Sequence, residues 1–171
     1  MSKKIFIILV LFGLTGCVST YNNEVLLKNN TKLDSALSVF IATPINGSYG
    51  GAVYRDSGES TAIAVRSAFM RHVNGVEVSE KCSDVECLRL ESNGKYGYLV
   101  VPAILHWEDR ATEWSGIKDK LEIKIVVYSS EGSEIASTII YGKSKWATFG
   151  GDHPQDLLPE PIKIYVQSLY I

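Results

Sequence analysis

The segment Leu121-Glu-Ile-Lys-Ile-Val-Val127 alternates apolar with charged side chains before it ends in two valines. A period of two residues is typical of a β-strand that has one face on a hydrophobic core. Glu131-Gly132 then predicts a turn, and residues 134–141 predict a strand that returns alongside the first. Residues 98–107, a long apolar run, predict the strand before them. We therefore expect three consecutive strands that pair as an antiparallel meander.

Strand-like and helix-like segments alternate upstream of this meander. Two short runs, Ser38-Val-Phe-Ile-Ala-Thr43 and Val76-Glu-Val78, contain the β-branched residues that are typical of buried strands. Between them, apolar residues recur at helical spacing up to Val73. Asp56 and Glu59 have the spacing of a capping box, so we expect the helix to begin there.

Two further helices complete the predicted order of elements. Ser83 and Glu86 repeat the capping-box spacing before a shorter helix, which Asn93-Gly94 is expected to end. Pro161 suits the first turn of a last helix that reaches Leu169. The order β-α-β-α-β-β-β-α predicts an α/β (α+β) fold, with helices packed on a single mixed sheet of about five strands.

The chain begins with a pattern that is typical of export. Two lysines precede an apolar run over residues 5–14, and Leu14-Thr15-Gly16-Cys17 follows directly. A charged start, a short apolar run and small residues before a cleavage point form a secretory signal. The run is too short for a membrane span, which needs roughly 20 apolar residues. We therefore expect residues 1–16 to be a signal peptide that is cut before Cys17.

A cysteine directly after the small pair resembles the lipobox of bacterial lipoproteins. In that family, the residue equivalent to Cys17 carries a diacylglyceryl thioether, so the resemblance implies a covalent lipid, and we expect no other cofactor. The alternative is an ordinary signal peptide with a coincidental cysteine. Val18 and Ser19 follow, where an aspartate would resemble a retention signal for the inner membrane. We therefore expect a lipid anchor at the periplasmic face of the outer membrane.

The residues after the cysteine are polar and rich in asparagine up to about residue 36. We interpret residues 17–36 as the lipidated cysteine and a tether that can dock locally. A flexible chain of this length lets the domain stand about 20 Å from the bilayer. Residues 37–171 are then expected to form a single globular α/β domain.

Charge and cysteine content narrow the class of protein. The formal net charge is −2, and removing the two leader lysines makes the mature chain more acidic, so no electrostatic footprint for nucleic acid is present. Cys82 and Cys87 remain as an even pair, which favours a disulfide in an exported protein. Two free thiols are the alternative. A metal site is disfavoured, because no second cysteine or histidine pair completes four ligands.

The predicted topology brings three loops to one edge of the sheet. The carboxyl ends of the first three strands share this edge, where the fourth strand begins and the fifth ends. The loops are Pro44–Arg55, His106–Lys118 and Lys143–His153. They contain or adjoin the candidate surface for a partner or ligand: Tyr49, His106, Trp107, Glu108, Asp109, Arg110, Trp114, Lys143, Lys145, Trp146, Asp152 and His153. The alternative is that the rings cap the open end of the core and the charges pair locally.

Three segments carry a family resemblance: Ser38–Pro44, His106–Gly116 and Gly142–Pro159. They are similar to the lipoprotein family known as domain of unknown function 4823, over nearly the whole mature chain. The resemblance implies a small envelope lipoprotein of Gram-negative bacteria and implies no particular activity. The order of elements also resembles the periplasmic α/β domains of curli secretion-channel lipoproteins and of the lipoproteins that activate penicillin-binding proteins.

Sequence patterns of enzymes are lacking. No G-x-S-x-G motif is present for a nucleophilic serine. Gly142-Lys143-Ser144 is similar to the end of a phosphate-binding loop, but Ser137 stands where that motif requires glycine. The histidines have no ligand spacing such as H-E-x-x-H.

We therefore expect a non-enzymatic interaction module that sits on a membrane through its lipid and binds another envelope protein. The alternative is a lipoprotein that binds a small ligand or glycan, or a weak hydrolase, at the same edge of the sheet. A channel subunit is disfavoured, because the strong hairpin over residues 120–141 is already used by the domain.

Overall fold

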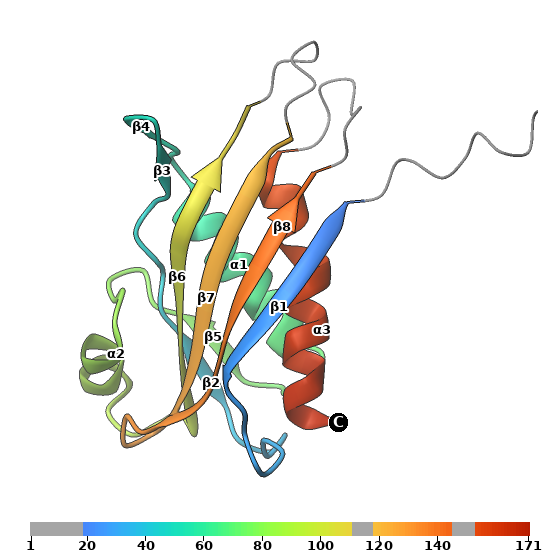
Figure 1. The fold of residues 1–171 in the computed structure, drawn as a ribbon. Coiled ribbons are helices and arrows are strands. Elements are labelled where there is room, and N and C mark those ends of the chain that lie inside the picture. The colour runs from blue at the N-terminus through green and yellow to red at the C-terminus, as the bar shows by residue number, and fades with distance from the viewer. Residues whose placement is uncertain (1–18, 111–117, 145–152) are drawn as a thin grey trace, which may run out of the picture.

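A computed structural model describes residues 19–110, 118–144 and 153–171. Within these residues lie a six-stranded mixed sheet, in the order β1-β8-β7-β6-β2-β5, and three α-helices (Figure 1). The α/β fold predicted from the sequence is confirmed. Cys17, Trp114, Lys145, Trp146 and Asp152 lie outside the described residues.

The antiparallel meander is the centre of the sheet. It consists of β6 (Tyr98–Glu108), β7 (Lys120–Ser129) and β8 (Glu134–Lys143). Leu121, Ile123 and Ile125 in β7 are buried, whereas the charged residues between them, Glu122 and Lys124, are half-buried on the opposite face. One face of β7 therefore packs on the hydrophobic core, as the two-residue period of its sequence predicts.

The parallel part of the sheet lies beside β6. Strand β2 (Val39–Ile41) pairs in parallel with both β6 and β5 (Val76–Val78). Helix α1 (Ser57–Phe69) connects β2 to β5, with the short hairpin of β3 and β4 before it. These connections give β2, β5 and β6 the shared direction that the predicted topology requires.

Two α-helices cover one face of the sheet, and one covers the other face. Helices α1 and α3 (Pro159–Tyr170) pack side by side on one face, as Figure 1 shows, and bury the larger hydrophobic core against it. A short 3-10 helix, η2 (Pro154–Leu157), leads into α3. Helix α2 (Val85–Ser92) lies on the other face and buries a smaller core.

Part of the predicted tether is a strand. Thr20–Leu27 forms β1, which pairs antiparallel with β8 at the edge of the sheet. The hydroxyl of Thr138 donates to the carbonyl oxygen of Glu24 at 2.9 Å, and the Tyr141 hydroxyl donates to its carboxylate at 3.0 Å. All eight residues of β1 are exposed, so the strand has no burial pattern by which its sequence differs from a polar linker. The sheet therefore has six strands, and residues 20–27 are not free to act as a spacer.

The caps of two helices differ from the predicted capping boxes. Asp56 precedes α1 in the left-handed conformation, with φ of 66°, and its side chain makes no capping hydrogen bond. Asp84, rather than Ser83, caps α2, because its carboxylate accepts a hydrogen bond from the Cys87 backbone N–H at 2.9 Å. The predicted end of α2 is confirmed, since Asn93 is left-handed.

The predicted disulfide is confirmed. Cys82 and Cys87 are joined, with their Cα atoms 5.3 Å apart, where the connection from β5 enters α2. The bond closes a small loop beside the minor core, to which Cys82 contributes a buried side chain. None of the helices in the described ranges is both long and apolar enough to span a bilayer.

Candidate functional site

Four strands meet at one end of the sheet in a single row of paired residues, which we call the end row. Thr20 of β1 lies opposite Lys143 of β8, Lys143 opposite Lys120 of β7, and Lys120 opposite Glu108 of β6. Strands β1 and β7 begin at this end, and β6 and β8 finish there (Figure 1). The predicted convergence of chain segments is therefore found in the described residues, with β1 as an additional member.

A small hairpin adds the segment after β2 to this end. Strands β3 (Ser48–Tyr49) and β4 (Ala52–Val53) pair antiparallel and lie beside β6. Gly47 permits this approach, because a Cβ atom at that position would lie 2.6 Å from the Cβ of Trp107. The hairpin thereby places the Tyr49 ring edge-on to the His106 ring, with 5.1 Å between the ring centroids.

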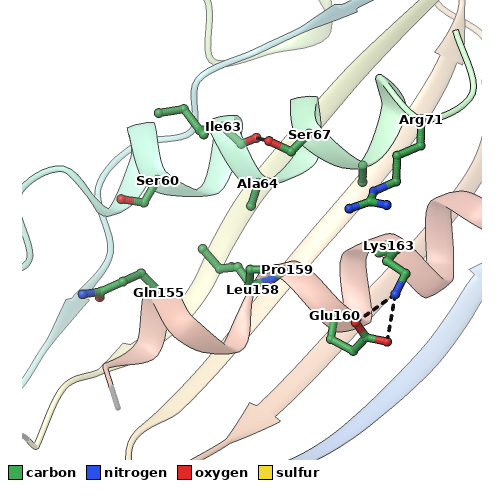
Figure 2. A pocket seen from close by; sticks show the side chains of 11 residues that line it. Ser60, Ile63, Ala64, Ser67, Arg71, Gln155, Leu158, Pro159, Glu160 and Lys163 are labelled. Carbon is green, nitrogen blue, oxygen red and sulfur yellow. Dashed lines mark hydrogen bonds and ion pairs between the residues drawn. The ribbon is translucent and has the colours of Figure 1, made fainter. Parts of the chain in front are cut away.

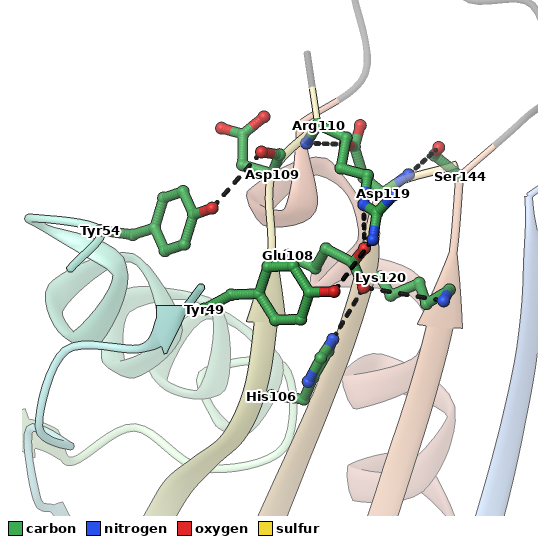
Figure 3. A network of polar contacts seen from close by, with 9 residues as sticks. All are labelled: Tyr49, Tyr54, His106, Glu108, Asp109, Arg110, Asp119, Lys120 and Ser144. Carbon is green, nitrogen blue, oxygen red and sulfur yellow. Dashed lines mark hydrogen bonds and ion pairs between the residues drawn. The ribbon is translucent and has the colours of Figure 1, made fainter. Parts of the chain in front are cut away.

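Glu108 is the buried centre of the polar contacts at this end, with 1% of its surface exposed (Figure 3). Its carboxylate accepts a hydrogen bond from Nε2 of His106 at 3.0 Å, forms an ion pair with Arg110, and lies 3.6 Å from Nζ of Lys120. Burial raises the pKa of the Glu108 carboxyl, but the His106 hydrogen bond and the charges of Lys120 and Arg110 outweigh it, so its pKa is lowered. Glu108 is therefore a buried carboxylate that the surrounding donors keep ionised.

The Arg110 guanidinium connects this carboxylate to the surface. It donates a hydrogen bond to the Tyr49 hydroxyl at 2.9 Å, and its Cζ atom lies 5.5 Å from the centroid of the Tyr49 ring. The hydrogen bond to Tyr49 and the charge of Glu108 raise the pKa of Arg110. Tyr49 remains 39% exposed, so the ring is held in place while one side of it faces solvent.

Asp119 and Ser144 join the strand ends to one another. The backbone N–H of Arg110 donates to the Asp119 carboxylate at 2.6 Å. The Asp119 N–H donates to the Ser144 hydroxyl at 2.9 Å, and the Ser144 N–H donates to the Asp119 carbonyl at 3.0 Å. Both side chains are buried. The candidate residues predicted from the sequence do not include Asp119, Lys120 or Ser144, because the role of these three residues depends on the register between strands.

A second polar contact lies on the α1 side of β6. Asp109 lies 3.3 Å from Nδ1 of His153, and its carbonyl oxygen accepts a hydrogen bond from the Tyr54 hydroxyl at 3.4 Å. Tyr54 and Asp109 border a cavity of 560 Å³, which is also lined by polar side chains that include Arg55 and Gln155. This cavity is separate from the Tyr49–Arg110 contact.

The predicted candidate residues fall into different environments. Tyr49, His106, Glu108 and Arg110 are in mutual contact, and Asp109 contacts His153. Lys143 is exposed in the end row. Trp107 is only 2% exposed and belongs to the larger core, so it cannot be part of a surface. Neighbouring residues of a strand point to opposite faces, which is why Trp107 is buried between His106 and Glu108.

The hydrogen-bond partner of His106 is a carboxylate. Within the described part of the chain, His106 hydrogen-bonds to Glu108 and to no serine or cysteine that it could activate as a nucleophile. Cys82, Cys87 and Glu91 bring potential metal-ligand atoms within 4.8 Å of one another, but the disulfide occupies both sulfurs. The exposed groups that the fold holds rigidly are the Tyr49 ring and the Arg110 guanidinium.

A groove lies between α1 and α3. Figure 2 shows its lining, in which Ala64 of α1 points toward Leu158 and Pro159. The cavity has a volume of 460 Å³, and the ion pair of Lys163 with Glu160, at 3.1 Å, lies at its rim. The ion pair joins two residues of the same helix, so these two charges are paired within α3 and do not indicate a ligand.

Solved structures of other proteins have a similar fold. The PelC dodecamer from Paraburkholderia phytofirmans has a TM-score of 0.62 at 10% identity, covering 85% of this chain and 96% of that one. A variant PelC dodecamer from the same organism has a TM-score of 0.65 at 11% identity, covering 89% and 99%. Protein XCC0632 from Xanthomonas campestris, of the DUF330 family, has a TM-score of 0.53 at 12% identity, covering 84% and 90%. At these identities the similarity shows a shared fold.

Comparison with curated proteins gives no match. The family model described as "Domain of unknown function (DUF4823)" matches residues 31–169. This range extends from the residues after β1 to the last turn of α3, and it includes the described residues of the strand ends apart from β1. The chain therefore belongs to the DUF4823 family, as the resemblance in its sequence indicates.

Proposed function

We propose that this protein is a non-enzymatic interaction module of the bacterial envelope. Lipid on Cys17 holds it at the periplasmic face of the outer membrane, and a protein partner binds the Tyr49 surface, which consists of Tyr49, His106 and Arg110. The observation that carries the proposal is the fixed, half-exposed Tyr49 ring between His106 and Arg110. Tyrosine and arginine are the residue types that most often anchor protein interfaces.

The exposed part of the ring supports a protein as the partner. Tyr49 is 39% exposed, and its hydroxyl accepts a hydrogen bond from the Arg110 guanidinium, which pairs with the buried Glu108. A partner would bury the ring, while Arg110 supplies a polar contact. Because Glu108 and Tyr49 already fix the guanidinium, little side-chain freedom is lost on binding.

The membrane location rests on the sequence of the leader. The charged start, the apolar run and the cysteine at position 17 support acylation, and the family resemblance supports an envelope lipoprotein. Two or three acyl chains make detachment rare, since a single chain binds only reversibly. The partner is then expected to be another component that reaches the same membrane.

Crosslinking in intact cells tests the partner surface. A photoreactive phenylalanine analogue placed at position 49 should give a discrete crosslinked species. The same analogue at Leu90 is the matched control, because that side chain is 73% exposed on α2, away from the Tyr49 surface. A crosslink of equal yield at both positions, or none at position 49, would contradict the proposal. Mass spectrometry of the crosslinked species identifies the partner.

The similar PelC structures are dodecamers, so a second copy of this chain is one partner to test. Sedimentation of the purified, detergent-solubilised lipoprotein distinguishes a dodecamer from a monomer. If the chain self-associates through the Tyr49 surface, Tyr49→Ala should shift the sedimentation toward the monomer, and Leu90→Ala should leave it unchanged.

A small ligand or glycan is the second candidate function, which the cavity of 560 Å³ favours. Arg55, Asp109 and Gln155 offer charged and amide groups at this cavity, as recognition of sugar hydroxyls requires. Cell-wall fragments should then raise the melting temperature of the protein, and Arg55→Ala should abolish the shift. The absence of a shift across wall fragments and nucleotides would exclude this candidate.

A further inference from the structure

The antiparallel pairing of β1 fixes where a lipid on Cys17 would hold the domain. Three residue steps separate Cys17 from Thr20, the first residue of β1. A chain extends by at most about 3.6 Å per residue, so the Cα atom of Cys17 can lie no more than about 11 Å from the start of this strand. Thr20 stands opposite Lys143 in the end row. The end row is therefore held close to the bilayer, nearer than the distance of about 20 Å that a flexible tether over residues 17–36 would allow.

Three lysines stand at this end of the sheet. Lys118 precedes β7, and Lys120 and Lys143 are direct neighbours across β7 and β8. Two of the carboxylates beside them are withdrawn from solvent, since Glu108 is 1% exposed and Asp119 is 4% exposed, whereas Glu24 and Glu122 line a depression next to Lys143. The Lys120 side chain is 45% exposed.

The arrangement depends on the fold. No run of basic residues occurs along the chain between the leader and the last residue. The sheet nevertheless places these three lysines together, at the end from which the anchored strand begins. Basic residues near an anionic membrane surface attract it, and the effect is about fivefold in affinity for each lysine.

The geometry points to Lys118, Lys120 and Lys143 as a contact surface for the anionic phospholipid headgroups of the membrane that carries the anchor. This inference rests on the proposed lipid at Cys17. The lysines lie against the headgroups, and β6 runs away from the membrane toward its first residue. The Tyr49 surface borders the same end on the side of β6, so its partner is expected to lie at the membrane as well.

Fluorescence quenching measures this orientation. The acylated full-length protein is inserted into vesicles of phosphatidylcholine with 30% phosphatidylglycerol, which also contain a lipid with a nitroxide on its headgroup. A fluorophore is attached at Lys143→Cys or, in the control, at Lys95→Cys. Lys95 lies just before β6, whose 11 residues at about 3.3 Å per residue separate it from the end row by roughly 33 Å. Strong quenching at position 143 with none at position 95 supports the inference, and equal or reversed quenching overturns it.

Charge variants test the role of the lysines. In the protein labelled at position 143, Lys118→Gln with Lys120→Gln should lower the quenching on phosphatidylglycerol vesicles to the level on pure phosphatidylcholine. The control, Lys28→Gln with Lys81→Gln, removes the same charge from exposed positions outside the end row and should change nothing. If the quenching is the same on both kinds of vesicle and in both variants, the lysines do not contact anionic headgroups, and this part of the inference is wrong.

The two proposals fail in different ways. Mass spectrometry of the inserted protein reports whether Cys17 carries acyl chains. A Cys17 without lipid contradicts the anchor and hence the proposed location. An acylated Cys17 with quenching at position 95 leaves the anchor intact and overturns only the orientation.

Discussion

Nε2 of His106 lies 3.0 Å from a carboxylate oxygen of Glu108, two residues further along β6 and on the same face of the sheet. Trp107, between them, fills the core on the opposite face. One strand thus supplies both an apolar residue that stabilises the fold and two polar residues that build the site. Because Glu108 also contacts Arg110 and Lys120, the order of the site and the stability of the strand ends are coupled.

Glu108→Gln should lower the free energy of unfolding by about 1–2 kcal/mol. Removing one partner of a buried ion pair costs several kcal/mol, but Arg110 and Lys120 are partly exposed and regain water, which reduces the effect. Urea unfolding measures the change. Glu86→Gln is the control, because its ion pair with Arg89 is exposed on both sides, and its effect should stay below about 0.5 kcal/mol. Equal effects of the two substitutions would contradict the central role of Glu108.

Stability should depend on pH through Glu108. The pKa of its carboxyl is lower in the folded protein than the usual 4.5. Its contribution to stability is therefore fully present above pH 4.5 and is lost as the pH falls through the folded-state pKa. Urea unfolding between pH 6 and pH 3 should show a smaller difference between wild type and Glu108→Gln at the acidic end. A difference that stays constant over this range would contradict the lowered pKa.

Reduction of the Cys82–Cys87 disulfide should lower the free energy of unfolding by about 2 kcal/mol, the value expected from chain entropy for so short a loop. The measurement is urea unfolding of the wild type with and without a dithiol reductant. The Cys82→Ser, Cys87→Ser double variant should lose at least as much, because Cys82 is buried and serine is polar. A reduced protein as stable as the oxidised one would show that the bond does not restrain the unfolded chain.

Thr138→Val should loosen β1. The buried Thr138 hydroxyl donates to the Glu24 carbonyl, so its loss should cost about 1 kcal/mol of stability and increase amide hydrogen exchange in residues 20–27. Ser67→Ala is the control, because that exposed hydroxyl bonds only within α1. Unchanged exchange in β1 would mean that this hydrogen bond does not hold the strand to the sheet.

The sequence predicts the meander and the helices well because burial leaves a periodic pattern. Ile123 and Ile125 are fully buried, and their two-residue spacing identifies β7 from the chain alone. Strand β1 was not predicted, because an exposed edge strand is held by backbone pairing and has no apolar face. The cap of α2 was placed one residue early, since Ser83 and Asp84 are both suitable caps and only the backbone conformation selects Asp84.

The sequence predicts those members of the candidate site that the topology alone brings together. The topology brings the ends of β6, β7 and β8 together, so Tyr49, His106 and Arg110 could be grouped before any contact was known. Lys120 and Asp119 were missed, because their contacts depend on the register of β7 against β6 and on the turn of the chain before β7. The sequence leaves open whether Trp107 lies on the surface or caps the core. The structure places it in the core, just after a bulge near Ile104 that shifts the register of β6 against β7.

The central claim is that acyl chains on Cys17 keep the Tyr49 surface at a membrane. Growth of cells with tritiated palmitate, followed by membrane fractionation, tests it most directly. We predict that the wild-type protein is labelled and sediments with the outer membrane, whereas Cys17→Ser is unlabelled, retains its leader and leaves that fraction. An unlabelled wild type, or a Cys17→Ser variant that is processed and fractionates identically, would contradict the account.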